Sequence, residues 1–515
     1  MRLQSSIKHI FSNLNFHDIF DRNYKFKIIN SLTSAFILFN LPVMIKEYII
    51  ILAGIYTAFS CANITKDKQK TGKESDNPKP NIIFIMADDL GYGDLECYGQ
   101  RKIKTPNIDS LAAQGMLFTQ CYAGSSVCAP SRNVLMTGMH TGHVTVRGNF
   151  GKGGVKGLGG GEGRVPLSAG DTTIAQVLRK AGYVTAMVGK WGLGEPHTTG
   201  EPNKKGFDEF YGFLNQRRAH TYYPDYIWKD TTKVVLTGNE DGQRKEYTHE
   251  LFVNYILDFL NRNQNKPFFL YVPFCIPHAA YEVPDYGIYE DEHWTDIEKA
   301  YAAMITRMDA SVGRIMKKLK ELNIDDNTWV FFTSDNGPSA EDDSLKMFDS
   351  GGPFRGAKRD PYEGGIRVPM IVRCPREIAP GQTNDFVWYF ADVMPTLASI
   401  AHTRAPENID GINVLPVLQG KKQDTIQRYL YWEFYERTGW RALRYGDWKA
   451  VQQDMYYKEP RAIELYNLKD DISESHNIAD QHPEIIMKVK ELFREAHRPS
   501  PNFMWKPAAK SANTL

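Results

Sequence analysis

The chain has 515 residues, a formal net charge of +1, and 42% hydrophobic and 24% charged residues. This composition is ordinary for a globular protein and excludes a disordered chain or a fibrous repeat. With 62 basic and 61 acidic side chains, no overall field attracts nucleic acid, so recognition of an anion must be local. Six cysteines in a chain of this length do not form a disulfide scaffold.

An apolar run, residues 48–60, ends at Cys61 near the amino terminus. It is too short to span a membrane but has the length of a signal-peptide core, and Lys46 precedes it. The run resembles a bacterial lipoprotein signal, which implies that Cys61 is lipidated and that translation starts at Met44. The alternative is a buried apolar segment of a longer amino-terminal region. This signal region (1–61) and the polar linker that follows (62–79) predict a protein of the bacterial cell envelope, periplasmic or outer-membrane, whose only membrane contact is the lipid anchor.

Residues 80–420 predict one large α/β domain. Short β-branched and aromatic runs predict strands at 81–86, 183–188, 267–274 and 328–333. Helices are expected at 172–182, 248–260 and 297–319, with Asp171 and Thr248 as N-caps of the first two and a methionine-rich apolar stripe along the third. Strands that alternate with helices predict a mostly parallel sheet covered on both faces.

The pattern changes from residue 421 to residue 515. Aromatic-rich strands are expected within 428–436, 441–453 and 463–468, and a helix at 483–496. This order predicts a small α+β subdomain with a short antiparallel sheet. The glycine-rich stretch 151–163 follows no strand, and neither of its lysines precedes Ser or Thr, so we interpret it as a mobile surface loop rather than a phosphate-binding loop.

Polar pairs follow two of the predicted strands. Asp88 and Asp89 come after the first strand, and Asp335 and Asn336 after the strand at 328–333. Ligands of open α/β sheets bind at the carboxyl ends of the strands, and adjacent carboxylates favour a cation between them. Oxygen ligands without a nearby Cys or His favour Ca²⁺ or Mg²⁺ over Zn²⁺. The alternative is turn chemistry, because Asp-Asp and Asp-Asn-Gly are both good turn formers.

The most specific motif is Cys128-Ala129-Pro130-Ser131-Arg132, followed by NVLMTG. Here the sequence resembles the formylglycine-dependent sulfatases, from about residue 80 to the carboxy terminus. Further motifs follow in the order of that family, namely ADD (87–89), GKW (189–191), IPHAAY (276–281), SDNG (334–337), and Lys358 ahead of YEGGIRVP (362–369). The resemblance implies an alkaline-phosphatase-like sandwich with a large, mixed, mostly parallel sheet. The alternative for Cys128 is a buried structural cysteine.

In this family the motif cysteine is oxidised to an aldehyde, formylglycine, which hydrates to a diol. One hydroxyl of the diol attacks sulfur, which forms a sulfated enzyme, and the second re-forms the aldehyde and releases sulfate. The resemblance implies a single Ca²⁺, with Mg²⁺ possible, and a maturation enzyme that generates formylglycine. The implied roles are metal binding for Asp88, Asp89, Asp335, Asn336 and modified Cys128, orientation of the diol for Arg132, sulfate binding for Lys190 and Lys358, and general acid for His278.

One position departs from the family pattern. Many members carry His two residues after the motif lysine, where it assists release of sulfate, whereas this chain has Gly192. The base for that step must lie elsewhere. His140 and His143, in a loop close in sequence to Cys128, are the candidates, and we prefer His140.

Residues 215–223 (NQRRAHTYY) combine basic, imidazole and aromatic side chains, which suits a sulfated sugar. His220 is the expected specificity residue; the alternative is a surface loop with incidental aromatics. With Gly192 and the 140–149 loop, this stretch resembles bacterial sulfatases that act on galactose-type sugars. The predicted function is therefore hydrolysis of a sulfated sugar or aryl sulfate.

Two other functions stay open. A phosphatase or phosphodiesterase of the same superfamily would carry a Ser or Thr nucleophile and two Zn²⁺, and Cys128 with Pro130 and Arg132 argues against it. An inactive carbohydrate-binding lipoprotein would not need the complete set of Cys128, Arg132, Lys190, His278 and Lys358. The pairing of Cys97, Cys121, Cys275 and Cys374 is left undetermined.

Overall fold

The computed structural model describes residues 79–156, 163–339, 342–423 and 428–505. The apolar run, Cys61 and the linker up to residue 78 lie outside the described residues, as does the middle of the glycine-rich loop, 157–162. Within the described ranges no helix is long and apolar enough to cross a membrane. In those same ranges the cysteines are free, including the four left unassigned above.

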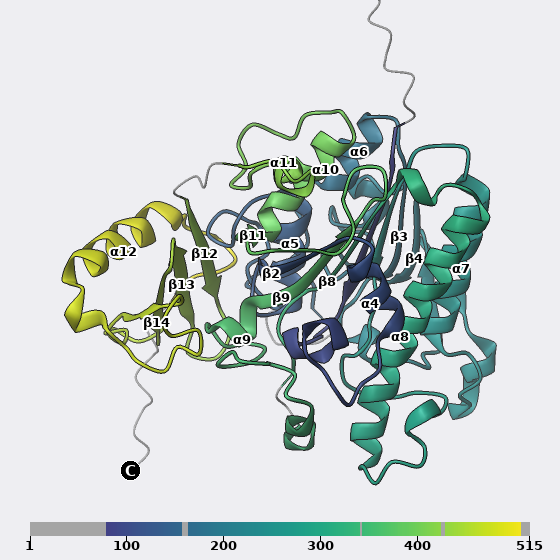
Figure 1. Ribbon diagram of the computed structural model, residues 1–515, viewed down its shortest axis with the longest axis horizontal. Coiled ribbons are helices and arrows are strands. Elements are labelled where there is room, and N and C mark those ends of the chain that lie inside the picture. Colours follow the sequence, from purple (N-terminus) through teal and green to yellow (C-terminus); the bar gives the residue numbers. More distant parts are fainter. Residues whose placement is uncertain (1–78, 157–162, 340–341, 424–427, 506–515) are drawn as a thin grey trace, which may run out of the picture. The chain divides into compact units, whose positions relative to one another are not determined.

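A mixed sheet forms the centre of the described chain (Figure 1). Five adjacent strands run parallel, in the order β8 (Thr328–Ser334), β1 (Asn81–Ala87), β7 (Phe268–Pro273), β3 (Val184–Lys190) and β4 (Glu209–Phe213). The four strands predicted from the sequence are thus confirmed to within two residues, and all lie in this parallel core.

The sheet continues with strands that the sequence did not reveal. Beside β8, β9 (Arg367–Arg373) is antiparallel to both β8 and β2 (Met116–Tyr122). Beyond β4 come β5 (Tyr226–Lys229) and β6 (Thr232–Val235), also antiparallel, while β10 (Gln382–Asn384) and β11 (Trp388–Tyr389) pair with β2. The sheet is therefore mixed, with parallel strands at its centre and antiparallel pairs on either side of them.

Helices cover both faces of this sheet, as the alternating pattern predicted. The side chains of β1 point in turn to the two faces, so Ile82, Phe84 and Met86 enter one apolar core, and Ile83, Ile85 and Ala87 enter the other. The first core is completed by α5 (Cys128–Thr137), α6 (Ile174–Lys180), α10 (Val393–Ile400) and α11 (Leu415–Leu418), and the second by α4 (Pro106–Ala113), α7 (Thr248–Asn263) and α8 (Asp296–Glu321).

Both predicted N-caps were wrong. The N-cap of α6 is Thr173, whose hydroxyl accepts from the Gln176 N–H at 3.3 Å, while Asp171 accepts from the Thr145 hydroxyl at 2.9 Å. Thr248 is already the first residue of α7, and its hydroxyl donates to the Tyr222 carbonyl at 3.1 Å. The Thr248 hydroxyl is used by a partner distant in sequence, and Asp171 accepts from both the distant Thr145 and the nearby Ser168 N–H.

A second, four-stranded antiparallel sheet follows, as expected from the carboxy-terminal pattern. It consists of β12 (Tyr429–Phe434), β13 (Trp440–Tyr445), β14 (Trp448–Gln453) and β15 (Glu464–Asn467), with α12 (Pro483–Ala496) packed on one face. Residues from Pro78 onward group into one compact unit, so the boundary at 420/421 stays a prediction. The short helix α9 (Glu363–Ile366) contributes Glu363, which pairs with Lys449 of β14.

Candidate active site

The acidic residues at the ends of β1 and β8 come together at one edge of the sheet. The two strands are parallel neighbours with Ala87 opposite Ser334, so the residues that follow them lie side by side. The Asp89 N–H donates to Asp335 Oδ1 at 3.2 Å, and Asn336 Nδ2 donates to Asp89 Oδ1 at 2.7 Å. All four side chains, including that of Asp88, are buried. The register of two strands thus assembles the predicted metal ligands.

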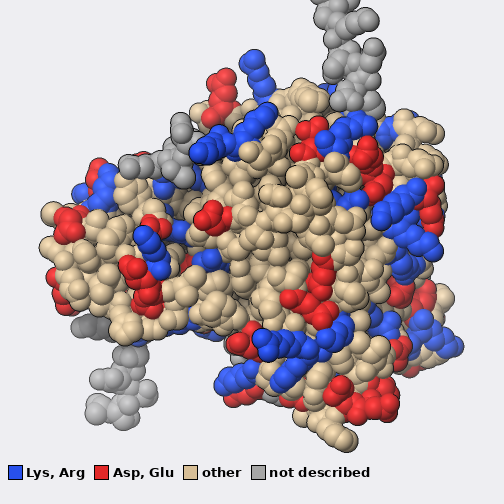
Figure 2. Space-filling model, viewed as in Figure 1, with Lys and Arg blue, Asp and Glu red and all other residues tan. Residues whose placement is uncertain are grey.

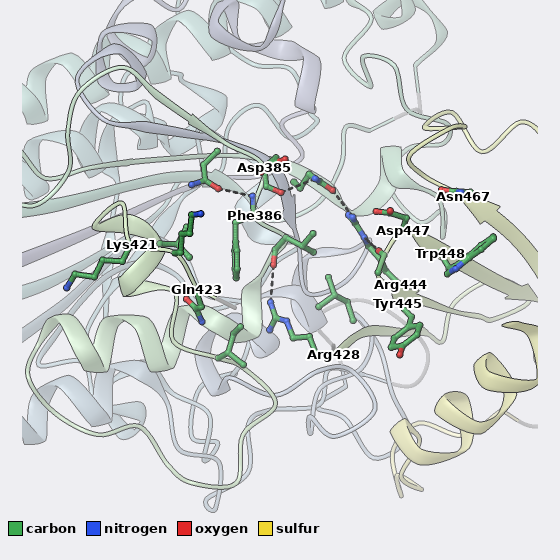
Figure 3. Close-up of a pocket in the computed structure, with 18 of the residues that line it drawn as sticks. Asp385, Phe386, Lys421, Gln423, Arg428, Arg444, Tyr445, Asp447, Trp448 and Asn467 are labelled. Carbon is green, nitrogen blue, oxygen red and sulfur yellow. Dashed lines mark hydrogen bonds between the residues drawn. The ribbon is translucent and has the colours of Figure 1, made fainter. Parts of the chain in front are cut away.

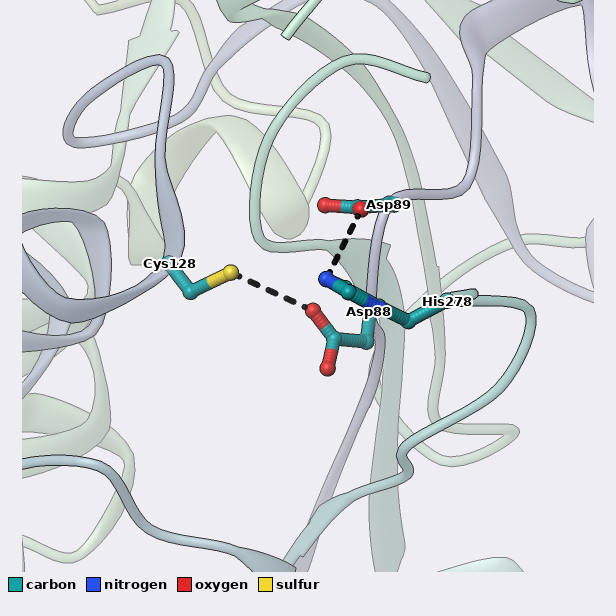
Figure 4. Close-up of side chains that lie close together, drawn as sticks. All are labelled: Asp88, Asp89, Cys128 and His278. Atoms are coloured by element: carbon teal, nitrogen blue, oxygen red, sulfur yellow. Dashed lines mark hydrogen bonds and ion pairs between the residues drawn. The ribbon is translucent and has the colours of Figure 1, made fainter. Parts of the chain in front are cut away.

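Cys128 is the first residue of α5 and is buried at the positive end of the helix dipole. Its thiol donates to Asp88 Oδ1 at 3.4 Å (Figure 4). Lys190 Nζ lies 3.5 Å from the sulfur. Burial raises the pKa of this thiol well above its usual range, and the nearby charges of Asp335 and Asp88 add to the shift. An unmodified Cys128 is therefore a neutral thiol and a poor nucleophile.

Three buried cations face the three carboxylates in matched pairs. The Nζ–Oδ2 distances are 2.5 Å for Lys190 with Asp88 and 2.5 Å for Lys358 with Asp89, and Arg132 Nη2 lies 2.7 Å from Asp335 Oδ2. Arg132 also donates through Nη1 to the Lys190 carbonyl at 2.6 Å. The six charges sum to zero in a buried cluster. On the face drawn in Figure 2, by contrast, acidic and basic side chains are interspersed, so charge of one sign is not concentrated there.

The carboxylates of this cluster differ in proton affinity. Burial alone would raise the pKa of Asp89, but the charges of Lys358, His278 and Lys190 outweigh it and hold that pKa well below the usual range. Burial and the charge of Asp88 raise the pKa of Asp335 to about 6, against the opposing charge of Arg132. Asp89 is therefore more firmly ionised than Asp335.

His278 belongs to the same group. The expectation of oxygen ligands without a nearby His or Cys was therefore wrong, because Cys128 and His278 both lie beside Asp88 and Asp89. The loop after β7 places His278 Nε2 at 3.3 Å from Asp89 Oδ2 (Figure 4). The same atom lies 3.0 Å from Lys358 Nζ. Nδ1 donates to the Ala279 carbonyl, so in the neutral ring Nε2 carries the lone pair that faces Lys358. Burial lowers the pKa of His278 to about 3, and the charge of Lys358 adds to the shift.

His220 lies directly against His278. The two imidazole rings stack with centroids 3.7 Å apart and an angle of 20° between their planes. The Tyr222 hydroxyl donates to the His278 carbonyl at 2.6 Å, which ties the 215–223 loop to the loop after β7. The structure thus brings the expected specificity residue to the edge of the charged cluster.

These residues fit a bound hard cation. The amide Oδ1 of Asn336 is buried and accepts no hydrogen bond from the described residues, while its Nδ2 is already used. This orphaned oxygen and the carboxylates of Asp88, Asp89 and Asp335 make an oxygen-rich donor set of the kind that Ca²⁺ and Mg²⁺ prefer. Asp88, Asp89, Cys128 and His278 also offer ligand atoms within 4.8 Å of one another.

Two small residues, Ser131 and Gly337, hold the site together, and the sequence analysis gave neither a role. The Ser131 hydroxyl donates to the Asp335 carbonyl at 2.5 Å and joins α5 to the loop after β8. A Cβ on Gly337 would lie 1.9 Å from the Gly364 carbonyl oxygen, so only glycine allows this loop to pack against the segment that follows Lys358. Ser131 lies in the motif that begins at Cys128, and Gly337 lies in the SDNG motif. Membership of these motifs was the only indication in the sequence that the two residues matter.

His140 lies in a different cluster. Its ring stacks on His143 at a centroid distance of 4.0 Å, and His143 Nδ1 lies 2.9 Å from Asp410 Oδ2. The Gly142 N–H donates to His140 Nδ1 at 3.2 Å, so Nε2 carries the proton in the neutral ring. Within the described ranges no hydrogen bond joins His140 to Cys128, so its role in sulfate release stays a prediction.

A cavity of about 850 Å³ lies elsewhere, between the two sheets (Figure 3). Asp385, Phe386, Arg428, Arg444 and Trp448 are among the residues that line it, and the charged cluster around Cys128 contributes none. Arg428 is already paired with Asp392, at 2.6 Å from Oδ2. The lining of this cavity therefore includes none of the residues expected to carry the chemistry.

Comparison with known proteins agrees with this site. Residues 80–403 match the family model described as Sulfatase, and residues 355–498 match the one described as N-sulphoglucosamine sulphohydrolase, C-terminal. The chain is 29% identical to an N-acetylgalactosamine-6-O-sulfatase of Bacteroides thetaiotaomicron, over 84% of this chain and 96% of that protein. It is 34% identical to the N-acetylgalactosamine-6-sulfatase of Sus scrofa, over 72% and 71% of the two chains.

Among solved structures, Ps i-CgsB in complex with k-i-k-neocarrahexaose superposes with a TM-score of 0.70 and 28% identity, over 81% of this chain and 93% of that one. The alkaline-phosphatase-like fold expected from the motifs is confirmed. The chain belongs to the sulfatase family, whose members hydrolyse sulfuric esters with the help of a metal ion and a formylglycine residue.

Proposed function

We propose that this sulfatase removes sulfate from a sugar of the galactose type, with Ca²⁺ as its metal and formylglycine formed from Cys128. The observation that carries the proposal is the position of Cys128 at the start of α5, within 3.5 Å of Asp88 and Lys190. Its thiol is neutral, so ordinary cysteine catalysis does not suit the site, whereas an aldehyde hydrate at this position would supply two hydroxyl groups.

The charge balance of the cluster suits a sulfate ester. Three cations and three carboxylates sum to zero, and one divalent ion would bring the cluster to a net charge of +2. Such a preorganised positive site favours an anion and the charge that develops on the departing oxygen. A Ca²⁺ held by Asp88, Asp89, Asp335 and Asn336 would polarise a sulfate oxygen and the attacking hydroxyl.

The chain's own residues take the remaining roles. Lys190 is paired with Asp88, and Lys358 is paired with Asp89. The ammonium groups of both lysines donate to the sulfate oxygens. Arg132 is fixed by Asp335 and the Lys190 carbonyl, and it holds the side chain at position 128 in place. His278 presents Nε2 to the cluster; because the neutral ring carries its lone pair there, Nε2 must first take up a proton before it can act as general acid for the leaving oxygen.

Relatives support a sugar as the leaving group. One relative is named for N-acetylgalactosamine-6-O-sulfate hydrolysis, and one similar structure holds a neocarrahexaose. His220, stacked on His278, would contact the sugar ring next to the scissile bond.

The test combines mass spectrometry across Cys128 with a screen of sulfated monosaccharides and oligosaccharides. The protein is co-expressed with a formylglycine-generating enzyme, and the Cys128→Ala variant is the matched control. We expect the mass change of the aldehyde and release of sulfate from a galactose-type sugar, both absent in the control. Complete conversion without activity on any sulfate ester would refute the proposal.

We further propose that the mature protein is lipidated at Cys61 and resides in the bacterial cell envelope, periplasmic or on the outer membrane. The proposal rests on the sequence pattern of residues 44–61 alone. Mass spectrometry of the mature amino terminus tests it: a diacylglyceryl mass on Cys61 is expected, and an unmodified peptide that crosses Cys61 would contradict it.

A further inference from the structure

A second buried polar cluster adjoins the charged site. Its members are Arg164, Glu195 and Gln216, all of which are buried. Arg164 Nη1 donates to Gln216 Oε1 at 2.7 Å, and Arg164 Nε lies 3.9 Å from Glu195 Oε1. The guanidinium also lies over the Phe150 ring, 4.8 Å from its centroid. Side chains from three separate segments therefore converge on one guanidinium.

This cluster contacts the elements that carry the catalytic residues. A Cβ on Gly192, two residues after Lys190, would lie 2.6 Å from Gln216 Cγ, and the backbone there has φ +78°. Because residue 192 is glycine, the Gln216 side chain can pack against the backbone that follows β3. On the other side, Arg164 Nη1 lies 3.4 Å from the Asn149 carbonyl, and Asn149 Oδ1 accepts from the Ala129 N–H, next to Cys128.

Three polar atoms of the cluster have no hydrogen-bond partner among the described residues. They are two donors, Arg164 Nε and Gln216 Nε2, and one acceptor, Glu195 Oε2. Buried polar atoms in native proteins are normally paired, because each orphaned group costs about 1–3 kcal/mol. Three such atoms in one cluster indicate a ligand that can both accept and donate hydrogen bonds.

The cluster is buried to about the same degree as the catalytic residues. Arg164 is 7% exposed and Glu195 and Gln216 are 3% exposed, compared with 6% for Lys358 and 7% for His278.

The chemistry of the three atoms favours neutral hydroxyl groups. A second anionic group would meet the carboxylate of Glu195, which repels it, whereas a hydroxyl can accept from Arg164 or Gln216 and donate to Glu195. We propose that Arg164, Glu195 and Gln216 form a subsite that binds hydroxyl groups of the sugar whose sulfate lies at Cys128. This inference rests on the proposed carbohydrate substrate.

The test compares two substrates in three variants, Arg164→Met, Glu195→Gln and Gln216→Leu. One substrate is the sulfated galactose-type sugar, and the other is 4-nitrophenyl sulfate, which has no sugar hydroxyl groups. Loss of a hydrogen bond to a hydroxyl should lower kcat/KM on the sugar by about 10- to 100-fold. On the aryl sulfate kcat/KM should stay within about threefold, as in the control Arg179→Met, which alters an exposed arginine on α6.

A sugar that lacks the hydroxyl adjacent to the sulfate completes the experiment. The wild type should lose the same factor on this deoxy substrate, and the variants should lose nothing further. An equal fall on both substrates in all three variants would refute the subsite and assign the cluster a structural role. Wild-type activity on the aryl sulfate with none on any sulfated sugar would instead refute the carbohydrate function.

Discussion

A buried lysine connects the small sheet to the main one, and its removal should destabilise the protein. Lys449 of β14 lies 3.0 Å from Glu363 Oε1 and 3.2 Å from Glu474 Oε1, and all three side chains are fully buried. The Glu363 N–H donates to Glu474 Oε2 at 2.7 Å, so the two carboxylates are close neighbours. The Lys449→Met variant leaves both carboxylates without this shared cation.

The magnitude follows from the remaining partners. Glu363 keeps Arg367 Nη1 at 3.3 Å and the Tyr122 hydroxyl at 2.5 Å, whereas Lys449 is the cation that faces Glu474. Breaking a buried pair on one side costs about 3–5 kcal/mol, since the other charge stays buried. We therefore expect the free energy of unfolding of Lys449→Met at pH 8 to fall by about 3–5 kcal/mol.

The loss should depend on pH. Burial raises the pKa of Glu474 to about 7; the charge of Glu363 adds to the shift and that of Lys449 opposes it. Without Lys449 this pKa rises further, so Glu474 is neutral at pH 5 and no unpaired charge stays buried. The difference between variant and wild type should thus be smaller at pH 5 than at pH 8, because a raised carboxyl pKa favours the folded state only at low pH.

The assay is urea unfolding at both pH values, with the exposed Lys469→Met as the matched control. The control should change stability by less than about 0.5 kcal/mol. Lys449→Met/Glu474→Gln should recover part of the loss at pH 8, since Gln carries no charge. A loss below about 1 kcal/mol, or no recovery in the double variant, would refute the reasoning.

Three further predictions concern the charged site and its surroundings. Burial raises the pKa of Asp94 to about 6. The free energy of unfolding of the wild type should therefore fall by about 3 kcal/mol relative to that of Asp94→Asn as pH rises from about 4 to 6. Urea midpoints of the two proteins that run parallel across this pH range would contradict the prediction. Because Lys190, Lys358 and Arg132 already balance the carboxylates, chelation with EDTA should abolish sulfatase activity without loss of the far-ultraviolet circular dichroism signal, and unfolding on chelation would argue against that balance. Gly192→Ala, at φ +78° and against Gln216, should lower the Tm and reduce kcat/KM at least about tenfold; wild-type values for both would show that the turn tolerates a side chain.

The sequence by itself determined the features that depend only on residues close together along the chain. The short, mostly apolar runs of β1, β3, β7 and β8, rich in β-branched and aromatic residues, predicted strands that are buried on both faces. The five-residue motif at Cys128 and the acidic pairs at strand ends needed no tertiary information either. Since parallel strands carry their carboxyl ends to one edge, the grouping of Asp88 with Asp335 followed as well.

Only the tertiary structure decided the partners of these residues. The pairs Lys190–Asp88 and Lys358–Asp89 join residues 102 and 269 positions apart, and no local pattern encodes such a contact. The N-cap of α6 is Thr173 rather than Asp171, which accepts from Thr145, and contacts with Asp410 and His143 hold His140 in a cluster of its own.

The same holds for the cluster of Arg164, Glu195 and Gln216. Each of these residues alone resembles an ordinary surface position, and their orphaned atoms become visible only when separate loops are packed together. A sequence specifies which groups can do chemistry, because that depends on residue type. The distances between those groups are set by the register of the strands and the packing of the loops, which are properties of the folded chain as a whole.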